Sequence, residues 1–218
     1  MKDFTDIVVI LDRSGSMESI RTDTEGGFNA FVKEQQETPG DCALSLYQFD
    51  DKYDVVYENR PIAEVPALEL APRGTTALLD AVGKTIATRG EYYGNLPEED
   101  RPGRVVVVIM TDGQENASRE YRRDRIKEMI TTQQDTYKWQ FVFLGANIDS
   151  FAVAGGMGIR AASTMDFSAD SDGVAYSYAS ASRNIANYKS AHVGSDMSGF
   201  TDTDRANAKK GSSGNLVN

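Results

Sequence analysis

The chain has 218 residues, of which 23 are Lys or Arg and 33 are Asp or Glu, so its formal net charge at pH 7 is −10. This length suits one α/β domain with a full core, because chains divide into several domains only above roughly 250 to 300 residues. The negative charge would repel a phosphate backbone, so we expect no nucleic-acid partner.

The first third of the chain predicts a buried strand, a helix and a hairpin. The apolar run "IVVIL" at residues 7–11 lacks polar alternation, which favours a strand covered on both faces. Apolar residues at helical spacing then predict a helix over 18–37. In "ALSLYQFDDKYDVVYE", at 43–58, two strand-like runs flank "DDK", which indicates a hairpin and therefore an antiparallel edge strand.

The middle of the chain alternates helices with buried strands. Helical periodicity predicts helices over 77–89 and 118–134. The runs "VVVVIM" at 105–110 and "FVFLG" at 141–145 predict two further central strands. This alternation is typical of a doubly wound α/β fold with a mixed, mostly parallel sheet and right-handed crossovers.

The signal weakens toward the end of the chain. "AASTMDF" at 161–167 predicts a short last strand, and apolar spacing predicts a final helix over 172–189. From Gly194 onward the sequence is polar and rich in Gly and Ser, too poor in large aliphatic residues to offset its ordering entropy. We therefore expect one domain over residues 1–190 and a flexible polar tail over 191–218.

The composition also favours a cytoplasmic protein. Cys42 is the only cysteine, so no intramolecular disulfide can form, and a reducing compartment fits best. The apolar run at 7–11 is too short for the core of a signal peptide, and no stretch reaches the length that spans a bilayer. We expect no membrane partner.

Polar oxygen-bearing side chains follow two of the predicted central strands. Asp12, Ser14 and Ser16 alternate in "DRSGSM", and Asp112 follows the strand at 105–110 in "TDGQEN". Ligands bind doubly wound sheets beyond the carboxyl ends of the strands, where these residues lie. A turn that leaves a strand can direct alternate side chains at one centre, and Gly15 removes bulk that would obstruct it.

A third segment adds a hydroxyl donor. In "RGTTALLDAV", Gly74 permits a tight turn, and Thr75 or Thr76 precedes the helix predicted at 77–89. Carboxylates and hydroxyls without His or Cys form an all-oxygen set, which selects Mg²⁺, Mn²⁺ or Ca²⁺ over Zn²⁺ or Cu²⁺. The sequence therefore predicts a divalent-metal site.

These three motifs together resemble the metal-ion-dependent adhesion site (MIDAS) of von Willebrand factor A domains, here of a free-standing bacterial or phage type. The resemblance covers roughly residues 5–190, and it rests on Asp-x-Ser-x-Ser at 12–16, the Thr of "GTTAL" and "TDG" at 111–113. It implies a Rossmann-like, three-layer α/β/α fold whose six-stranded sheet has one antiparallel edge strand.

The resemblance also implies the roles of the site residues. Ser14 and Ser16 correspond to direct ligands of Mg²⁺ or Mn²⁺, and Asp12 and Asp112 to carboxylates that act mainly through water. Thr76 is preferred over Thr75 as the third hydroxyl from its spacing to "LLDA". An open metal position would take an Asp or Glu side chain of a partner protein, because the ion dominates the local field.

Other interpretations remain beside this one. Ser16 alone could cap a helix. Asp12 could be the nucleophile of a metal-assisted phosphatase, although Ser14 stands where such enzymes place their second Asp as general acid. A structural assembly subunit, whose site only stiffens its loops, is the third interpretation. We expect a binding module that is not an enzyme; the sequence leaves its partner and oligomeric state open.

Overall fold

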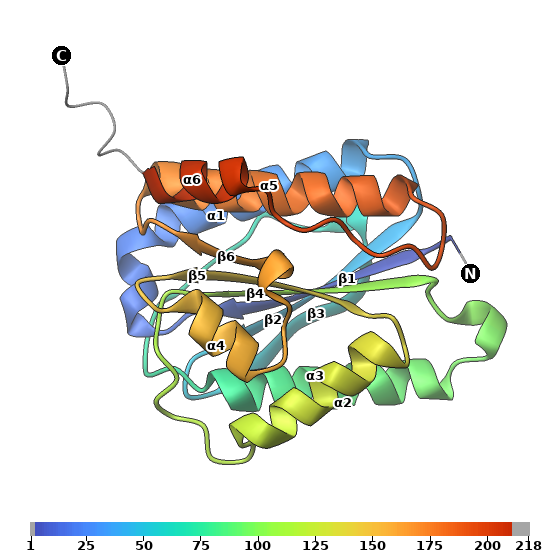
Figure 1. Cartoon of the computed structure of the whole chain (residues 1–218), viewed down its shortest axis with the longest axis horizontal. Coiled ribbons are helices and arrows are strands. Elements are labelled where there is room, and N and C mark those ends of the chain that lie inside the picture. The colour runs from blue at the N-terminus through green and yellow to red at the C-terminus, as the bar shows by residue number, and fades with distance from the viewer. Residues whose placement is uncertain (1–2, 211–218) are drawn as a thin grey trace.

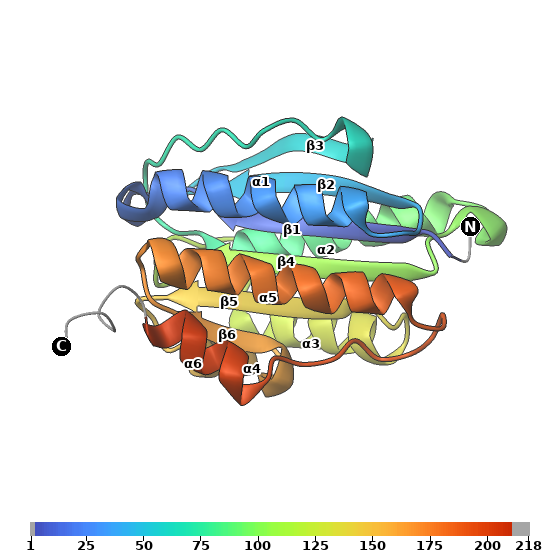
Figure 2. The same ribbon diagram turned by 90° about the horizontal axis from the view of Figure 1, so that it is seen from above.

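The strands form one mixed sheet in the computed structural model, which describes residues 3–210. The six strands lie in the order β3-β2-β1-β4-β5-β6, side by side as Figure 2 shows. Five are parallel, and the edge strand β3 pairs antiparallel with β2. Their bounds are β1 (Thr5–Asp12), β2 (Cys42–Phe49), β3 (Tyr53–Pro61), β4 (Arg104–Thr111), β5 (Gln140–Ala146) and β6 (Thr164–Phe167).

Helices cover both faces of this sheet and make three layers. Figure 1 shows α1, α5 and α6 on one face and α2, α3 and α4 on the other. The helices are α1 (Arg21–Glu37), α2 (Leu78–Asn95), α3 (Arg123–Asp135), α4 (Ser150–Gly156), α5 (Ser171–Ser190) and α6 (Asp202–Lys210). Short 3₁₀ helices cover Gly15–Ile20, Ile62–Glu64, Glu98–Asp100 and Ala161–Ser163. The predicted doubly wound α/β fold is therefore confirmed.

The alternation of side chains along each central strand explains the two helical layers. In β1, Ile7 and Leu11 pack into the core under α1 and α5, whereas Val8 and Ile10 pack into the core over α2 and α3. All four side chains are fully buried. Burial of each such side chain contributes about 1.5 to 3 kcal/mol, and because both faces gain it, the strand carries a continuous apolar run.

The predicted strands and the hairpin are confirmed, but one helix begins later than predicted. The periodic segment 118–134 becomes helical only at Arg123, where α3 starts. The residues before it are held as a loop because the Asp80 carboxylate accepts hydrogen bonds from the backbone N–H groups of Arg119, Glu120 and Tyr121, at 2.8 to 2.9 Å. These contacts from α2 override the local helical pattern.

The polar tail predicted over 191–218 differs from the structure in its described part, residues 191–210. Helix α6 packs against α5 and β6, with Ala208 fully buried and Phe200 only 6% exposed. The Ser168 N–H donates to the Ala208 carbonyl at 2.9 Å, and Lys209 pairs with Asp166 at 3.1 Å. Composition did not predict this ordered segment because only two buried residues and backbone pairing hold it in place. Residues 211–218 of the predicted tail lie outside the described residues.

The sheet order brings the two polar loops of the sequence together. Strands β1 and β4 are neighbours, and Leu11 pairs with Met110 in their register. Asp12 ends β1 and Asp112 directly follows β4, so both carboxylates lie at the same edge of the sheet.

Candidate metal centre

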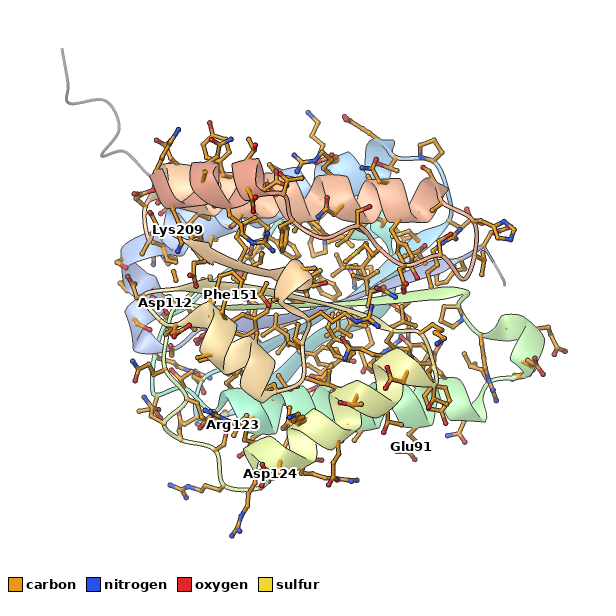
Figure 3. All side chains as sticks on the ribbon, in the orientation of Figure 1. Glu91, Asp112, Arg123, Asp124, Phe151 and Lys209 are labelled. Atoms are coloured by element: carbon orange, nitrogen blue, oxygen red, sulfur yellow. The ribbon has the colours of Figure 1, made fainter. Side chains whose placement is uncertain are left out.

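The five predicted site residues come from three segments and meet at the carboxyl edge of the sheet. Asp12 is the last residue of β1, and the backbone then turns into the 3₁₀ helix that carries Ser16. Asp112 follows β4, at the edge where Figure 3 labels it. Thr76 lies in the loop before α2. The Ser14 and Ser16 hydroxyl oxygens are 3.1 Å apart, and the Ser16 hydroxyl donates to Asp112 Oδ1 at 2.6 Å.

Three hydroxyl oxygens surround one small space above Gly113. A Cβ atom added to this glycine would lie 2.7 Å from Thr76 Oγ1, 3.3 Å from Ser16 Oγ and 3.4 Å from Ser14 Oγ. Glycine therefore keeps open a cradle that any other residue would fill. We name Ser14, Ser16, Thr76, Asp12 and Asp112 the oxygen cluster.

Asp112 has spare hydrogen-bonding capacity inside this cluster. Its side chain is only 3% exposed, and Oδ2 is buried without a hydrogen-bond partner. Burial raises the pKa of its carboxyl group, and the hydrogen bond from Ser16 opposes that shift. An unpartnered buried carboxylate oxygen is costly, so a cation or a metal-bound water near Oδ2 would be stabilising.

Asp12 is engaged through both of its oxygens. Oδ1 accepts from the Ser14 backbone N–H and Oδ2 from the Thr111 hydroxyl, both at 2.6 Å, and the residue is fully buried. Burial, with a smaller contribution from the charge of Asp112, outweighs the hydrogen bonds from Thr111 and Ser14 and raises its pKa to about 6. Two desolvated carboxylates at the same end of the sheet repel each other, and a divalent cation bound between the loops would offset that repulsion.

The donor chemistry fits a hard cation. The oxygen cluster offers hydroxyl and carboxylate oxygens, which Mg²⁺, Mn²⁺ and Ca²⁺ prefer. Within residues 3–210, no group of three or more His, Cys, Asp and Glu side chains is placed to hold a metal ion. The oxygen cluster has only two carboxylates, and its other three members are hydroxyl residues.

The structure gives different surroundings to Thr75 and Thr76, the two candidates for the third hydroxyl. Thr76 is 3% exposed and its hydroxyl faces Gly113, whereas Thr75 is exposed and lines a neighbouring groove with Lys84 and Arg119. The helix-cap interpretation of the serines finds no support. Ser14 begins the 3₁₀ helix without a side-chain cap hydrogen bond, and the Ser16 hydroxyl points to Asp112.

Asp50, at the end of β2, ties two of the loops together. Its Oδ2 accepts from Arg13 Nε at 2.9 Å and from Arg73 Nε at 2.8 Å. Burial alone would raise the pKa of Asp50, but the hydrogen bonds from Arg73 and the Lys52 backbone and the charge of Arg13 outweigh it, so the pKa is lowered. The loop after β1 is thereby fixed to the loop that carries Thr76.

Gly74 completes this connection between the loops. It adopts φ +68°, and a Cβ there would meet Asp51 Oδ1 at 2.4 Å, which confirms the predicted tight turn. Its carbonyl accepts from the Gly15 N–H at 3.3 Å.

The loop after Asp112 is fastened to the start of α2. Asn116 Oδ1 accepts from the Thr76 N–H at 2.9 Å, and the Asn116 N–H donates to the Thr76 carbonyl at 3.0 Å. Glu115 accepts from the Leu79 N–H at 2.9 Å and from the Ser118 N–H at 2.8 Å. These contacts position the Thr76 hydroxyl from the opposite side.

Sequence reasoning did not identify Thr111, Asp50 or Asn116 as positioning residues. Each is polar: Asp50 and Thr111 directly follow predicted strands, and Asn116 lies in the loop six residues after the strand predicted at 105–110. That position was the available signal, because the carboxyl ends of strands are where the loops of such a sheet build a site.

Comparison with solved structures identifies the fold. A structure of proximal thread matrix protein 1 from the mussel byssus with a zinc-occupied MIDAS motif matches 84% of this chain and 46% of its own, with 14% identity and a TM-score of 0.60. A von Willebrand factor type A protein from Catenulispora acidiphila matches 84% and 42%, with 11% identity and a TM-score of 0.57.

A third solved structure gives the same result. The ArnB paralog VWA2 from Sulfolobus acidocaldarius matches 85% of this chain and 45% of its own, with 16% identity and a TM-score of 0.51. This chain thus spans less than half the length of these proteins. Neither a protein-family model nor a curated protein matches the sequence. The solved structures and the mixed six-stranded sheet establish that this chain has the fold of von Willebrand factor A domains.

Proposed function

We propose that the chain is a divalent-metal-dependent protein-interaction module and not an enzyme. The observation that carries this proposal is the cradle above Gly113, where the hydroxyls of Ser14, Ser16 and Thr76 converge beside the unpartnered Oδ2 of Asp112. Hydroxyl ligands carry no charge, so an ion held mainly by them keeps more of its positive charge for a further ligand.

The ion would be Mg²⁺ or Mn²⁺, held by the oxygen cluster. Ser14, Ser16 and Thr76 would be its direct ligands, and Asp12 and Asp112 would accept hydrogen bonds from its water ligands. When bound, such an ion supplies an electrophilic coordination position for a carboxylate. The zinc-occupied MIDAS motif of the mussel byssus protein supports a metal at the corresponding motif here.

The open side of the cluster faces solvent, which suits a protein partner. Ser16 is exposed although Ser14 and Thr76 are buried, so an incoming side chain would approach from the Ser16 side. The partner would contribute an Asp or Glu carboxylate, which the ion attracts even though this chain is net negative. We further propose a cytoplasmic location; within the described range, no helix is long and apolar enough to cross a membrane.

Two measurements test the proposal. Titration calorimetry with Mn²⁺ and Mg²⁺ should show one site on the wild-type protein and none on Ser14→Ala/Ser16→Ala. Affinity capture from a lysate of the source cells should retain a partner with Mg²⁺ present, and lose it after chelation or with the double variant. Ser19→Ala, an exposed serine of the same 3₁₀ helix, is the matched control and should behave as wild type.

The two other interpretations make different predictions. A phosphatase that uses Asp12 would turn over a phosphate ester and lose that activity in Asp12→Ala. Asp12 is fully buried and both of its carboxylate oxygens already accept hydrogen bonds, which argues against a role as nucleophile. An assembly subunit with a merely stiffening site would lose thermal stability in Asp112→Ala but retain its partner. Identical captured proteins with and without metal would contradict the interaction module.

A further inference from the structure

A cavity, here called the second cavity, lies at the end of the sheet opposite the oxygen cluster, where β1 and β2 begin. It has a volume of about 540 Å³ and is formed by the start of β2, the end of β3 and the C-terminal part of α2. Figure 3 shows the two ends of the molecule, with Asp112 at one and Glu91 of α2 toward the other. No residue of the oxygen cluster lines this cavity. Its volume is within the range of small-molecule sites.

A buried ionic network forms one wall of the cavity. Asp6 of β1 is 2% exposed, and its Oδ2 accepts from Arg89 Nη2 and, at 2.7 Å, from the Tyr93 hydroxyl. Its Oδ1 is buried and has no hydrogen-bond partner. Asp6 and Tyr93 both line the cavity, whereas Arg89 does not. This buried oxygen has no donor, so a donor that reaches it from the cavity would be stabilising.

The network carries more negative than positive charge. Arg89 is shared between Asp6 and Glu58, whose carboxylate lies 4.0 Å from Arg89 Nη1. One guanidinium thus faces two carboxylates. Burial raises the pKa of Asp6, although the charge of Arg89 and the hydrogen bond from Tyr93 lower it, so the carboxylate is incompletely compensated.

An irregularity in the edge strand supports this wall. Asn59 has a left-handed backbone, φ 51°, and lies where the pairing of β2 with β3 shifts register. Its Oδ1 accepts from Arg89 Nη2 at 2.7 Å, and it also lines the cavity. Bulges and left-handed non-glycine residues are concentrated where a side chain must be directed at a site.

The remaining lining combines apolar side chains with acidic groups. Phe4, Ile62, Tyr92 and Leu96 provide apolar and aromatic surface, and the exposed Asp41 and Asp100 lie among the lining residues. Among the described residues that line the cavity there is no Lys, Arg or His. An apolar cavity whose charged lining residues are all carboxylates selects a ligand that is apolar in its body and positive at one end.

We propose that this cavity binds a small primary amine with an apolar body, and that its ammonium group donates to Asp6 Oδ1. The alkyl or aryl body packs against the aromatic and aliphatic side chains, and Asp41 and Asp100 attract the cation to the entrance. The site is independent of the metal, because the two regions share no residue and lie at opposite ends of the strands.

The test uses 2-phenylethylamine with the full chain, measured by amide shifts of ¹⁵N-labelled protein. We expect saturable shifts at Ala43, Ala63 and Tyr92, which line the cavity. The isosteric neutral probe 2-phenylethanol and the anionic probe phenylacetate should bind at least about tenfold more weakly. Chelation of divalent metal should leave amine binding unchanged, so failure of the metal proposal would not affect this result.

Variants separate the cavity from nonspecific attraction of amines to an acidic surface. Ala63→Trp places a bulky side chain at an exposed lining position and should abolish binding while the protein still folds. Asp41→Asn/Asp100→Asn should weaken binding several-fold, whereas Asp124→Asn, an exposed acid on α3, should have no effect.

Three outcomes would overturn the proposal. The first is equal affinity for the amine and the alcohol, and the second is undiminished binding by Ala63→Trp. The third is the absence of binding by 2-phenylethylamine, n-butylamine and n-hexylamine, which would leave water as the partner of Asp6 Oδ1.

Discussion

Gly113 shows how a single residue can decide whether an ion site exists. It has no side chain, and the space that a Cβ would occupy is bounded by the hydroxyls of Ser14, Ser16 and Thr76. Thr111, the last residue of β4 and two positions before Gly113, donates to Asp12 and accepts from the Gly113 N–H at 3.1 Å. The backbone at Gly113 is thus held under the cradle by a residue that does not belong to the oxygen cluster.

We expect Gly113→Ala to lower the affinity for Mn²⁺ at least about tenfold, because the added methyl group would fill the cradle and displace Thr76 Oγ1. Titration calorimetry measures this directly, with circular dichroism as a check on folding. Gly26→Ala, in α1, is the matched control, because a Cβ there has no atom within 4 Å. Wild-type affinity in Gly113→Ala would contradict the assigned cradle.

Hydroxyl geometry also distinguishes two residues that the sequence ranked by spacing alone. Thr75 and Thr76 are adjacent and have the same chemistry, so the local sequence predicts two candidates. The structure distinguishes them because Asn116, from the far side of the sheet edge, fixes the backbone of Thr76.

We predict that Thr76→Ala reduces Mn²⁺ affinity severalfold, while Thr75→Ala leaves it within about twofold of wild type, because only the Thr76 hydroxyl faces the cradle. Paired calorimetric titrations decide the matter. The reverse order of the two effects would assign the ligand to Thr75.

At the scale of elements, α6 shows how long-range contacts stabilise a segment of unpromising composition. Asp204 accepts from the Thr201 N–H and hydroxyl, both at 2.8 Å, and from Arg183 Nη2 at 2.5 Å. Burial alone would raise the pKa of Asp204, but these bonds and the charge of Arg183 outweigh it and lower the pKa. The ionised carboxylate therefore holds α6 to α5.

A carboxyl group whose folded-state pKa is depressed contributes stability above its unfolded pKa, about 4, and loses it as pH falls through the folded pKa. We therefore expect α6 to dock less firmly in acid. Asp204→Asn should cost about 1 to 2 kcal/mol at pH 7, and the difference from wild type should shrink as the pH falls below about 4. Urea unfolding at several pH values measures both effects.

The matched control for this prediction is Asp202→Asn in the same helix. The Asp202 side chain is fully exposed and its ion pair with Arg205, at 3.9 Å, is screened by water, so we expect the variant to unfold like wild type. Equal losses in the two variants would contradict a specific role of Asp204.

At the scale of the whole molecule, metal binding should stabilise the fold. The oxygen cluster joins the loops after β1 and β4 to the loop before α2, and none of these segments is adjacent in sequence. An ion that binds only the folded chain, at 100 times its dissociation constant, adds about 2.7 kcal/mol. For a chain of this length that corresponds to a rise of about 5 to 10 °C in the melting temperature.

Differential scanning calorimetry with and without Mg²⁺ checks this, and a chelator should reverse the shift. Ser14→Ala/Ser16→Ala should show no shift with metal. A melting temperature that does not respond to either Mg²⁺ or Mn²⁺ would argue against the proposed site.

The sequence by itself determined the class of fold and the chemistry of the candidate site. Buried strands read as apolar runs because both faces are covered, and "DDK" between two strand-like runs predicted the antiparallel edge. Since ligand loops follow the carboxyl ends of such strands, Asp12 and Asp112 could be paired before their distance was known. These inferences depend only on local pattern and on the rules of sheet topology.

Tertiary structure alone decided the features that depend on residues distant in sequence. Asp80 delays the start of α3 by binding the backbone of the preceding loop, and Asn116 positions Thr76 rather than its neighbour. Asp6 meets Arg89 across the interface between β1 and α2, which creates the wall of the second cavity. Local propensity cannot predict such contacts, because each of them forms only when the sheet and its helices pack together.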